Sequence, residues 1–162
     1  MSIIKIVLVN GLLMLSTLVP AQEKGWRGIV PLHSKRTDVE KKLGASVEQS
    51  PVLYKLKDMN ILVAYASDGV CGSETASGWK VPRDTVITIA IHFKTRLPLS
   101  DLRIDSSKYK IVADPEMRGN LYYYNAEEGL GIQVNENLVE SMSYFPATKD
   151  NHLLCPAPNA KQ

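Results

Sequence analysis

Strict alternation of apolar and polar residues predicts a half-buried strand in the middle of the chain. The stretch DTVITIAIHFK, residues 84–94, carries an apolar side chain at every second position and smaller or polar side chains between them. Because successive side chains of a strand point to opposite faces, this spacing predicts one buried and one solvated face. The apolar positions are Ile87, Ile89, Ile91 and Phe93, and His92 lies on the solvated face.

Shorter runs of the same kind predict further antiparallel strands on both sides of this one. PVLYKL and NILVAYA flank a polar turn around Lys57 and Asp58, which is the pattern of a hairpin. NLYYYN, GLGIQVN and LVESMSYF follow, with turns expected at 126–129 and 135–137. KYKIVAD adds a candidate strand before them. We therefore expect a sheet built mainly from neighbouring hairpins.

One short amphipathic helix is expected within LHSKRTDVEKKLG, residues 32–44. Ser34 is the expected N-cap, Val39 and Leu43 lie one helical turn apart, and Gly44 is typical of a helix end. The predicted fold class is therefore α+β, mainly an antiparallel sheet with a short N-terminal helix. The apolar pair of the helix is expected to cover part of the sheet.

The two halves of the chain have similar patterns. Residues 32–94 and residues 97–146 each begin with a polar or capped opening and continue with three strands. This suggests two degenerate helix-plus-sheet repeats. The halves differ at residues 67–83, which separate the second and third strands of the first half and are too many for a hairpin turn.

The first 21 residues have the pattern of a secretory signal peptide. Lys5 supplies a positive charge, residues 6–19 are mostly apolar, and Val19-Pro20-Ala21 resembles a signal peptidase site. The apolar run is shorter than the roughly 20 residues that a membrane span requires. We expect cleavage after Ala21, which leaves residues 22–162 as a single exported domain without an integral membrane span, in the periplasm or the medium.

The charge balance argues against a nucleic-acid partner. The whole chain has 19 basic and 17 acidic residues. One basic residue, Lys5, lies in the predicted signal, so the expected mature chain has 18 basic against 17 acidic residues and a net charge of +1. Neither a net charge this small nor the absence of long basic runs favours nucleic-acid binding.

Cys71 and Cys155 are the two cysteines of the chain. An even number of cysteines in an exported protein favours a disulfide, which here would tie the proline-rich C-terminal segment to the body. The alternative is that Cys71, in the sequence CGS, is a nucleophile of the papain-like type. The second cysteine and the adjoining aromatic residue of that pattern are missing, so the disulfide is the preferred interpretation.

No motif in the sequence indicates catalysis. His33, His92 and His152 are isolated in the sequence, although a spatial cluster with Asp150 remains open. No zinc-protease, serine-hydrolase or phosphate-binding pattern is present. The sequence therefore predicts no catalytic residue, no metal site and no cofactor.

Aromatic residues are the candidate binding residues. In a strand, Tyr122 and Tyr124 share one face and Tyr123 takes the other, so at least one face is aromatic. Trp79 lies in the long 67–83 segment, where it could contact a partner. The alternative in both cases is that the rings fill the core or cover the sheet.

A local resemblance supports the fold class and leaves the function open. Val39, then Leu43-Gly44, then strands, is similar to the SmpA/OmlA outer-membrane-assembly lipoproteins and to the tandem β-lactamase-inhibitor-protein fold, although no lipid-anchoring cysteine or inhibitory loop is present. The stretch from GWRGIVPLHSKRTDVEKKLG to YFPATKDNHLLC resembles uncharacterised bacterial secreted proteins. The resulting hypothesis is a non-catalytic binding or accessory module of the cell envelope, with an unknown protein or small ligand as partner. A secreted enzyme without a recognisable motif and a purely structural disulfide-braced domain are the alternatives.

Overall fold

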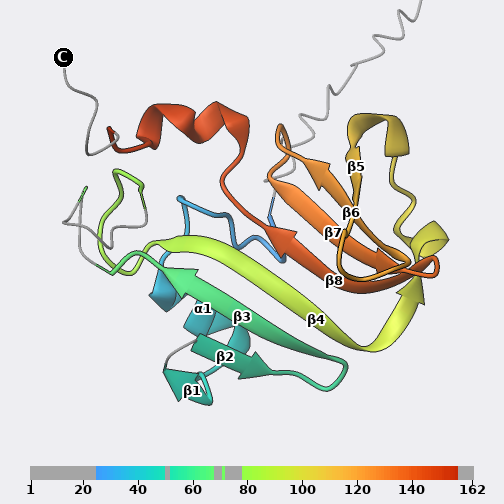
Figure 1. The fold of residues 1–162 in the computed structure, drawn as a ribbon. Coiled ribbons are helices and arrows are strands. Elements are labelled where there is room, and N and C mark those ends of the chain that lie inside the picture. Colours follow the sequence, from blue (N-terminus) through green and yellow to red (C-terminus); the bar gives the residue numbers. More distant parts are fainter. Residues whose placement is uncertain (1–24, 50–51, 68–70, 72–77, 157–162) are drawn as a thin grey trace, which may run out of the picture.

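A single antiparallel sheet organises the chain. The computed structural model describes residues 25–49, 52–67, 71 and 78–156, so the predicted signal peptide at 1–21 lies outside the described residues. Eight strands lie in the spatial order β1-β2-β3-β4-β8-β7-β6-β5 (Figure 1). They are β1 (Glu48–Gln49), β2 (Val52–Lys55), β3 (Met59–Tyr65), β4 (Val86–Pro98), β5 (Lys110–Ala113), β6 (Asn120–Asn125), β7 (Leu130–Asn135) and β8 (Leu138–Tyr144).

Four short helical segments accompany the sheet in the part of the chain that the structure describes. They are the α-helix α1 (Arg36–Leu43) and the 3₁₀ helices η1 (Leu99–Leu102), η2 (Ser106–Lys108) and η3 (Thr148–Leu153). The predicted mainly antiparallel α+β fold with one short N-terminal helix is therefore confirmed. No helix in the described part of the chain is long and apolar enough to cross a membrane.

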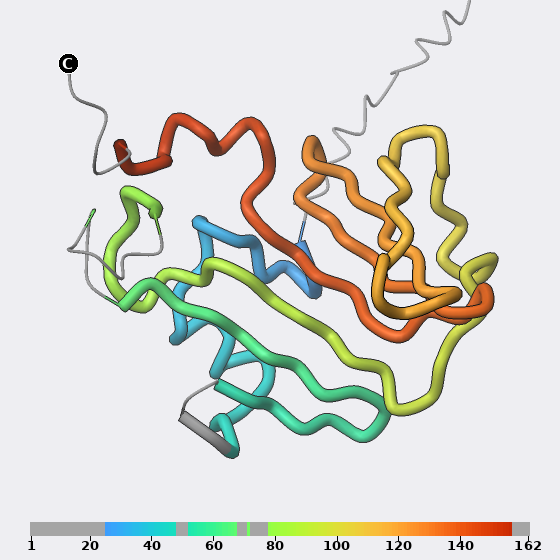
Figure 2. Tube along the Cα trace, in the orientation of Figure 1, coloured from blue at the N-terminus to red at the C-terminus, as the bar shows by residue number. Residues whose placement is uncertain are grey.

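β4 and β8 join the two parts of the sheet. The meander β2-β3-β4 and the meander β6-β7-β8 meet where β4 pairs with β8, with Ile91 opposite Met142. The tube in Figure 2 shows these two segments side by side, although they are far apart in the sequence. β4 continues to Pro98 and so extends past the expected start of the second half at residue 97. η1 and η2, rather than an α-helix, follow it.

The helix α1 begins one residue later than the sequence predicts. Lys35, not Ser34, is the N-cap residue, and its N–H donates to Asp38 Oδ2 at 2.8 Å. The prediction for Ser34 is wrong because its Oγ accepts the N–H of Val30 at 2.9 Å instead. Gly44 ends the helix as predicted, with a φ of 81° and its N–H donating to the carbonyl of Glu40.

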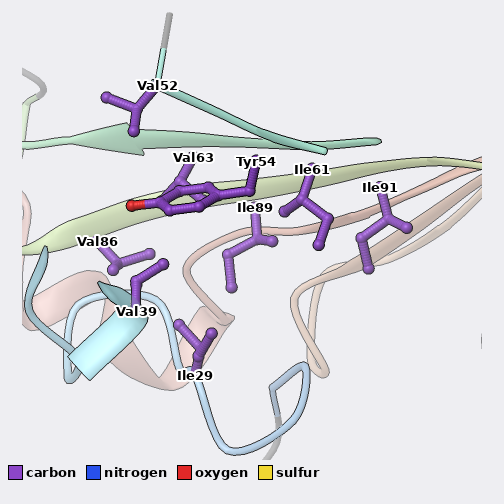
Figure 3. Close-up of a cluster of buried hydrophobic side chains, with 9 residues drawn as sticks. All are labelled: Ile29, Val39, Val52, Tyr54, Ile61, Val63, Val86, Ile89 and Ile91. Carbon is purple, nitrogen blue, oxygen red and sulfur yellow. The ribbon is translucent and has the colours of Figure 1, made fainter. Parts of the chain in front are cut away.

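α1 covers the first part of the sheet, as the sequence predicts. Val39 is fully buried among side chains of β2, β3 and β4, and Leu43 is packed against the same group. Figure 3 shows Val39 on the helix and Ile29 on the preceding loop below the strands. The first core cluster consists of Ile29, Val39, Val52, Tyr54, Ile61, Val63, Val86, Ile89 and Ile91.

The alternation predicted for β4 holds for most of the strand and fails at Ile87. Ile89 and Ile91 are fully buried in the first cluster, and His92 is exposed, as predicted. The pairing with β3 shifts between Ala64 and Tyr65, which adds a residue to β4 at this point. A bulge of this kind changes the direction of the side chains that follow it. Ile87 therefore packs in a separate cluster around Leu32, Ala66 and Val81, and Val86 enters the first cluster in its place.

The second part of the sheet is covered on the corresponding face by the 3₁₀ segments. Tyr123, Ile132, Val134 and Val139 form a second buried cluster. Leu99 and Leu102 of η1, together with Ile104 and Tyr109, pack against it. Both predicted turns are present, at 126–129 and at Glu136-Asn137 between β7 and β8. The neighbouring strand positions, including Tyr122 and Tyr124, therefore lie on the other face of the sheet.

Candidate functional site

Cys71 and Cys155 form the predicted disulfide. Their Cα atoms are 5.6 Å apart, and 84 positions separate them in the sequence. Backbone hydrogen bonds next to the disulfide also join the two segments. The N–H of Cys155 donates to the carbonyl of Gly78 at 2.7 Å, and the N–H of Lys80 donates to the carbonyl of Leu153 at 2.6 Å. The disulfide and this pairing hold the C-terminal segment against the body, and the bond is compatible with an oxidising, exported location.

Trp79 lies between these hydrogen bonds and is only partly exposed. The backbone of Trp79 forms an antiparallel bridge with Leu154, and its side chain packs against the cluster of Leu32, Ala66 and Val81. Most of the segment proposed from the sequence as a binding loop, residues 68–70 and 72–77, lies outside the described residues. In the described part, the ring of Trp79 covers a small core.

His33 and Asp150 form the spatial cluster that the sequence left open. His33 Nε2 lies 3.2 Å from Asp150 Oδ1, and Oδ2 of the same carboxylate accepts the N–H of Ala147. Asp150 is buried, whereas half of the His33 side chain is exposed. The Nδ1 of His152 instead contacts the carbonyl of Lys149. The contacts of Asp150 to His33 and to the N–H of Ala147 join the loop before α1 to η3.

A cleft of about 440 Å³ lies near the end of β3 and is lined in part by Arg36, Tyr65, Arg83 and Asp84. The guanidinium of Arg36 lies 4.2 Å from the centre of the Tyr65 ring, and its Nε donates to Asp84 Oδ1 at 3.0 Å. Burial and the hydrogen bond to Tyr54 raise the pKa of Tyr65 well above its ordinary value. Tyr65 therefore stays protonated at neutral pH and cannot act there as a base. Among the residues that the structure describes, no group of three or more His, Cys, Asp or Glu side chains could hold a metal ion.

The β5–β6 hairpin has the largest concentration of exposed apolar side chains. Over the described ranges, seven large hydrophobic residues are exposed, and five of them lie between residues 111 and 124. These five are Ile111, Val112, Met117, Tyr122 and Tyr124, and we call them the hairpin surface. The other two, Val47 and Leu154, lie elsewhere. Since exposed apolar groups that cluster mark interaction sites more often than scattered ones, the hairpin surface is the candidate functional site.

The tyrosines of β6 alternate as the sequence predicts. Tyr123 is buried in the second cluster, whereas Tyr122 and Tyr124 are 37% and 45% exposed on the opposite face. The ring of Tyr124 stacks on Phe145, with ring centres 4.9 Å apart and planes 5° apart. Gly131 lies opposite Tyr124 on β7, and a Cβ added to it would lie 3.5 Å from the Phe145 ring, so the missing side chain leaves room for that ring.

Tyr122 is held by a carboxylate of the hairpin turn. Its hydroxyl donates to Asp114 Oδ2 at 3.1 Å, and Oδ1 of Asp114 accepts the N–H groups of Glu116 and Met117. These backbone hydrogen bonds lower the pKa of Asp114, and the hydrogen bond to Asp114 raises the pKa of Tyr122. The phenol is thus neutral at physiological pH and is hydrogen-bonded to Asp114. Tyrosine has few rotatable bonds, so it contributes contact area at low entropic cost.

Sequence patterns indicated the tyrosines but not their apolar neighbours. Ile111 and Val112 belong to a run that the sequence already suggests as a strand, and their alternate positions would normally predict one buried side chain. Ile111 shares the face of Tyr123 and is exposed because β5 is the last strand of the sheet and lies outside the second cluster. Val112 lies on the opposite face, beside the exposed Tyr122. The position of a strand within a sheet is not encoded in its own residues.

No family model matches this chain, and neither does any curated protein or solved structure.

Proposed function

We propose that the protein is an exported, non-catalytic binding module that docks a protein partner on the hairpin surface. The observation that carries the proposal is the gathering of five of the seven exposed large hydrophobic residues on one hairpin. Tyrosine is enriched at protein interfaces, and the two rings here are already held by Asp114 and Phe145. Side chains held in this way lose little conformational freedom when a partner binds.

Export is the second part of the proposal. It is supported by the signal-like residues 1–21 and by a disulfide that would be reduced in most cytosols. The destination is the periplasm or the medium. The intact mass of the protein purified from its native envelope or culture medium should correspond to a chain that begins at Gln22. A mass that retains Met1 would overturn this part.

An internal duplication is a further part of the proposal. The meanders β2-β3-β4 and β6-β7-β8 lie next to each other in the sheet and meet through their last strands. α1 covers the first meander, and η1 with Ile104 and Tyr109 covers the second on the same face. The face is the same because Ile91, Met142 and Ile132 lie opposite one another. This arrangement supports two degenerate repeats, in which the helix of the second repeat is reduced to 3₁₀ turns.

The docking site can be tested with a matched pair of double variants. Tyr122→Ser/Tyr124→Ser removes two exposed rings from the hairpin surface, and Val47→Ser/Leu154→Ser removes the two exposed apolar side chains that lie elsewhere. Proteins captured from envelope extract by the wild type are identified by mass spectrometry, purified and titrated against all three forms. We expect the tyrosine variant to bind at least tenfold more weakly, which corresponds to about 1.4 kcal/mol. The control should bind like the wild type.

Three outcomes would overturn the proposal. If both variants, shown to be folded by circular dichroism, bind the purified partner as tightly as the wild type, the hairpin surface is not the docking site. If the purified wild type holds stoichiometric metal or converts a substrate, the enzyme alternative replaces the binding module. If no partner is captured and no activity is found, the structural disulfide-braced domain is the better interpretation.

A further inference from the structure

β5 is an edge strand whose outer side is open. Among the residues that the structure describes, it stands at the end of the sheet and has β6 as its one neighbouring strand (Figure 1). All four of its residues are exposed, including Ile111 at 49% and Val112 at 43%. An edge strand presents backbone N–H and C=O groups that can pair with another chain. Apolar side chains on such an edge favour that pairing.

The hydrogen bonds of the hairpin identify which backbone groups face outward. The N–H of Asp114 donates to the carbonyl of Asn120 at 3.0 Å, in line with the register that pairs Val112 with Tyr122. In an antiparallel ladder, every second residue directs both backbone groups to the same neighbour. Asp114, Val112 and Lys110 therefore bond toward β6. The N–H and C=O groups of Ile111 and Ala113 point to the open edge.

The order of charges along β5 allows two antiparallel copies of the strand to place opposite charges next to each other. Lys110 lies two residues before Val112, and Asp114 lies two residues after it, on the same face of the strand. If a second copy pairs antiparallel with Val112 on the two-fold axis, each Lys110 lies directly opposite the Asp114 of the other copy. Lys108 and Glu116 continue the same order of signs on either side.

The same register also satisfies the backbone. It places Ile111 opposite Ala113 of the second copy, and these are the residues whose N–H and C=O groups face outward. A shift by one residue would pair an outward residue with an inward one and would leave the ladder without hydrogen bonds. The alignment across Val112 therefore satisfies both the backbone and the charges.

We propose that the hairpin surface docks a second copy of this chain, with β5 pairing antiparallel to β5 across Val112. The inference rests on the proposed function in that it names the partner of the same hairpin. The dimer has one continuous sheet of sixteen strands, twice the eight of one chain, and carries Tyr122 and Tyr124 of both copies on one face. The paired edge is short, which places the contact in the small, transient class of interfaces.

Self-association is tested by sedimentation equilibrium over a concentration series into the high micromolar range. The wild type is expected to dimerise reversibly, and the association should weaken as salt is raised because it includes exposed ion pairs. Lys110→Glu places like charges opposite each other and should raise the dissociation constant at least tenfold. Lys57→Glu makes the same charge change in the exposed β2–β3 turn and should leave the constant unchanged.

Ala113→Pro tests the backbone pairing directly. Its N–H faces the open edge, so proline removes an intermolecular donor without removing a bond to β6. Dimerisation should be lost while the circular dichroism spectrum and the melting temperature of the monomer stay close to the wild type. If Ala113→Pro does not fold, Lys110→Glu carries the test alone, since that side chain is exposed.

A cysteine scan tests the register. Residues directly opposite each other in a non-hydrogen-bonded pair have Cα atoms about 4.5 Å apart, which suits a disulfide. Val112→Cys should therefore form a covalent dimer on mild oxidation, with Cys71–Cys155 verified by peptide mapping. Lys110→Cys should not, because its counterpart lies four residues away along the strand.

The outcomes separate this inference from the proposed function. A wild type that is monomeric at every concentration overturns self-pairing, while a purified partner that needs Tyr122 and Tyr124 would still support the docking site. A dimer that survives both Lys110→Glu and Ala113→Pro overturns the β5 contact and assigns dimerisation to another surface. A dimer cross-linked through Lys110→Cys and not through Val112→Cys overturns the register.

Discussion

His33 Nε2 and Asp150 Oδ1 lie 3.2 Å apart, although 117 positions separate the two residues in the sequence. The contact joins the loop before α1 to η3, and the same carboxylate accepts the N–H of Ala147. Asp150 is 4% exposed, so its oxygens depend on these partners rather than on water. The pair therefore fixes the path of the chain after β8.

Replacing Asp150 with alanine should destabilise the protein without affecting the hairpin. The variant leaves the N–H of Ala147 without its side-chain acceptor and removes the contact to His33. We expect the free energy of unfolding to fall by about 1–3 kcal/mol, measured by urea denaturation. Glu127→Ala, in the exposed β6–β7 turn, is the control and should change it by less than about 0.5 kcal/mol. Equal effects would show that the His33–Asp150 contact contributes nothing.

Loss of the disulfide should act on global stability and on one local backbone pairing. The chain-entropy model assigns about 4.6 kcal/mol to a loop that spans 84 positions, so Cys71→Ser/Cys155→Ser should melt at a markedly lower temperature. Hydrogen exchange at the N–H groups of Lys80 and residue 155 should become faster, because their partners are no longer tethered. The denatured, unreduced wild type should contain no free thiol. Two free thiols in the exported protein would contradict the assignment.

Gly129 is a position where a side chain is excluded both by the backbone and by a neighbour. Its φ is +62°, and an added Cβ would collide with the carbonyl oxygen of Phe145. Gly129→Ala should therefore cost more than about 2 kcal/mol in thermal or urea unfolding. Gly28→Ala is the matched control, because its φ is +69° but its nearest neighbour is the flexible end of Lys42. It should cost about 1 kcal/mol, and a similar cost for both variants would refute the collision.

The turn that holds Tyr122 should lose its order in acid. Hydrogen bonds from the N–H groups of Glu116 and Met117 lower the pKa of Asp114 below its ordinary value of 3.8. A carboxylate with a lowered folded-state pKa contributes stability above the ordinary value and loses it as the pH falls through the lowered one. Nuclear magnetic resonance of the two amides should therefore show a transition below pH 3.8 that is absent in Asp114→Asn. A midpoint above that pH would contradict the turn geometry.

Local patterns predicted the elements better than their positions. The alternation in β4 correctly predicts the burial of Ile89 and Ile91. Side chains two positions apart on a regular strand point to the same face, so their shared burial follows from the strand's own residues. The alternation fails at Ile87, where the partner strand shifts register, and a partner's register cannot be read from the residues of β4. Serine is a common N-cap residue, yet the hydroxyl of Ser34 accepts a hydrogen bond from the N–H of Val30 in the preceding loop.

The candidate site was predictable only in part for the same reason. The alternation of the tyrosines indicates an aromatic face. Tyr122 and Tyr124 share one face of β6, as the sequence predicts, and both are exposed. Ile111 shares the face of the buried Tyr123, so it has the position of a core residue, and it is exposed because β5 ends the sheet. The contact between His33 and Asp150 depends on the complete fold. Cys71 and Cys155 could be paired from the sequence because two cysteines leave a single intramolecular combination.

That single combination also sets when the brace can form. Cys155 follows Cys71 by 84 positions, and all of β4 to β8 lies between them, so the ribosome must finish nearly the entire sheet before both thiols exist. Oxidation therefore comes after the strands have had the opportunity to pair, and no incorrect intramolecular bond competes with it. Strand pairing selects the fold, and the covalent bond then slows its loss.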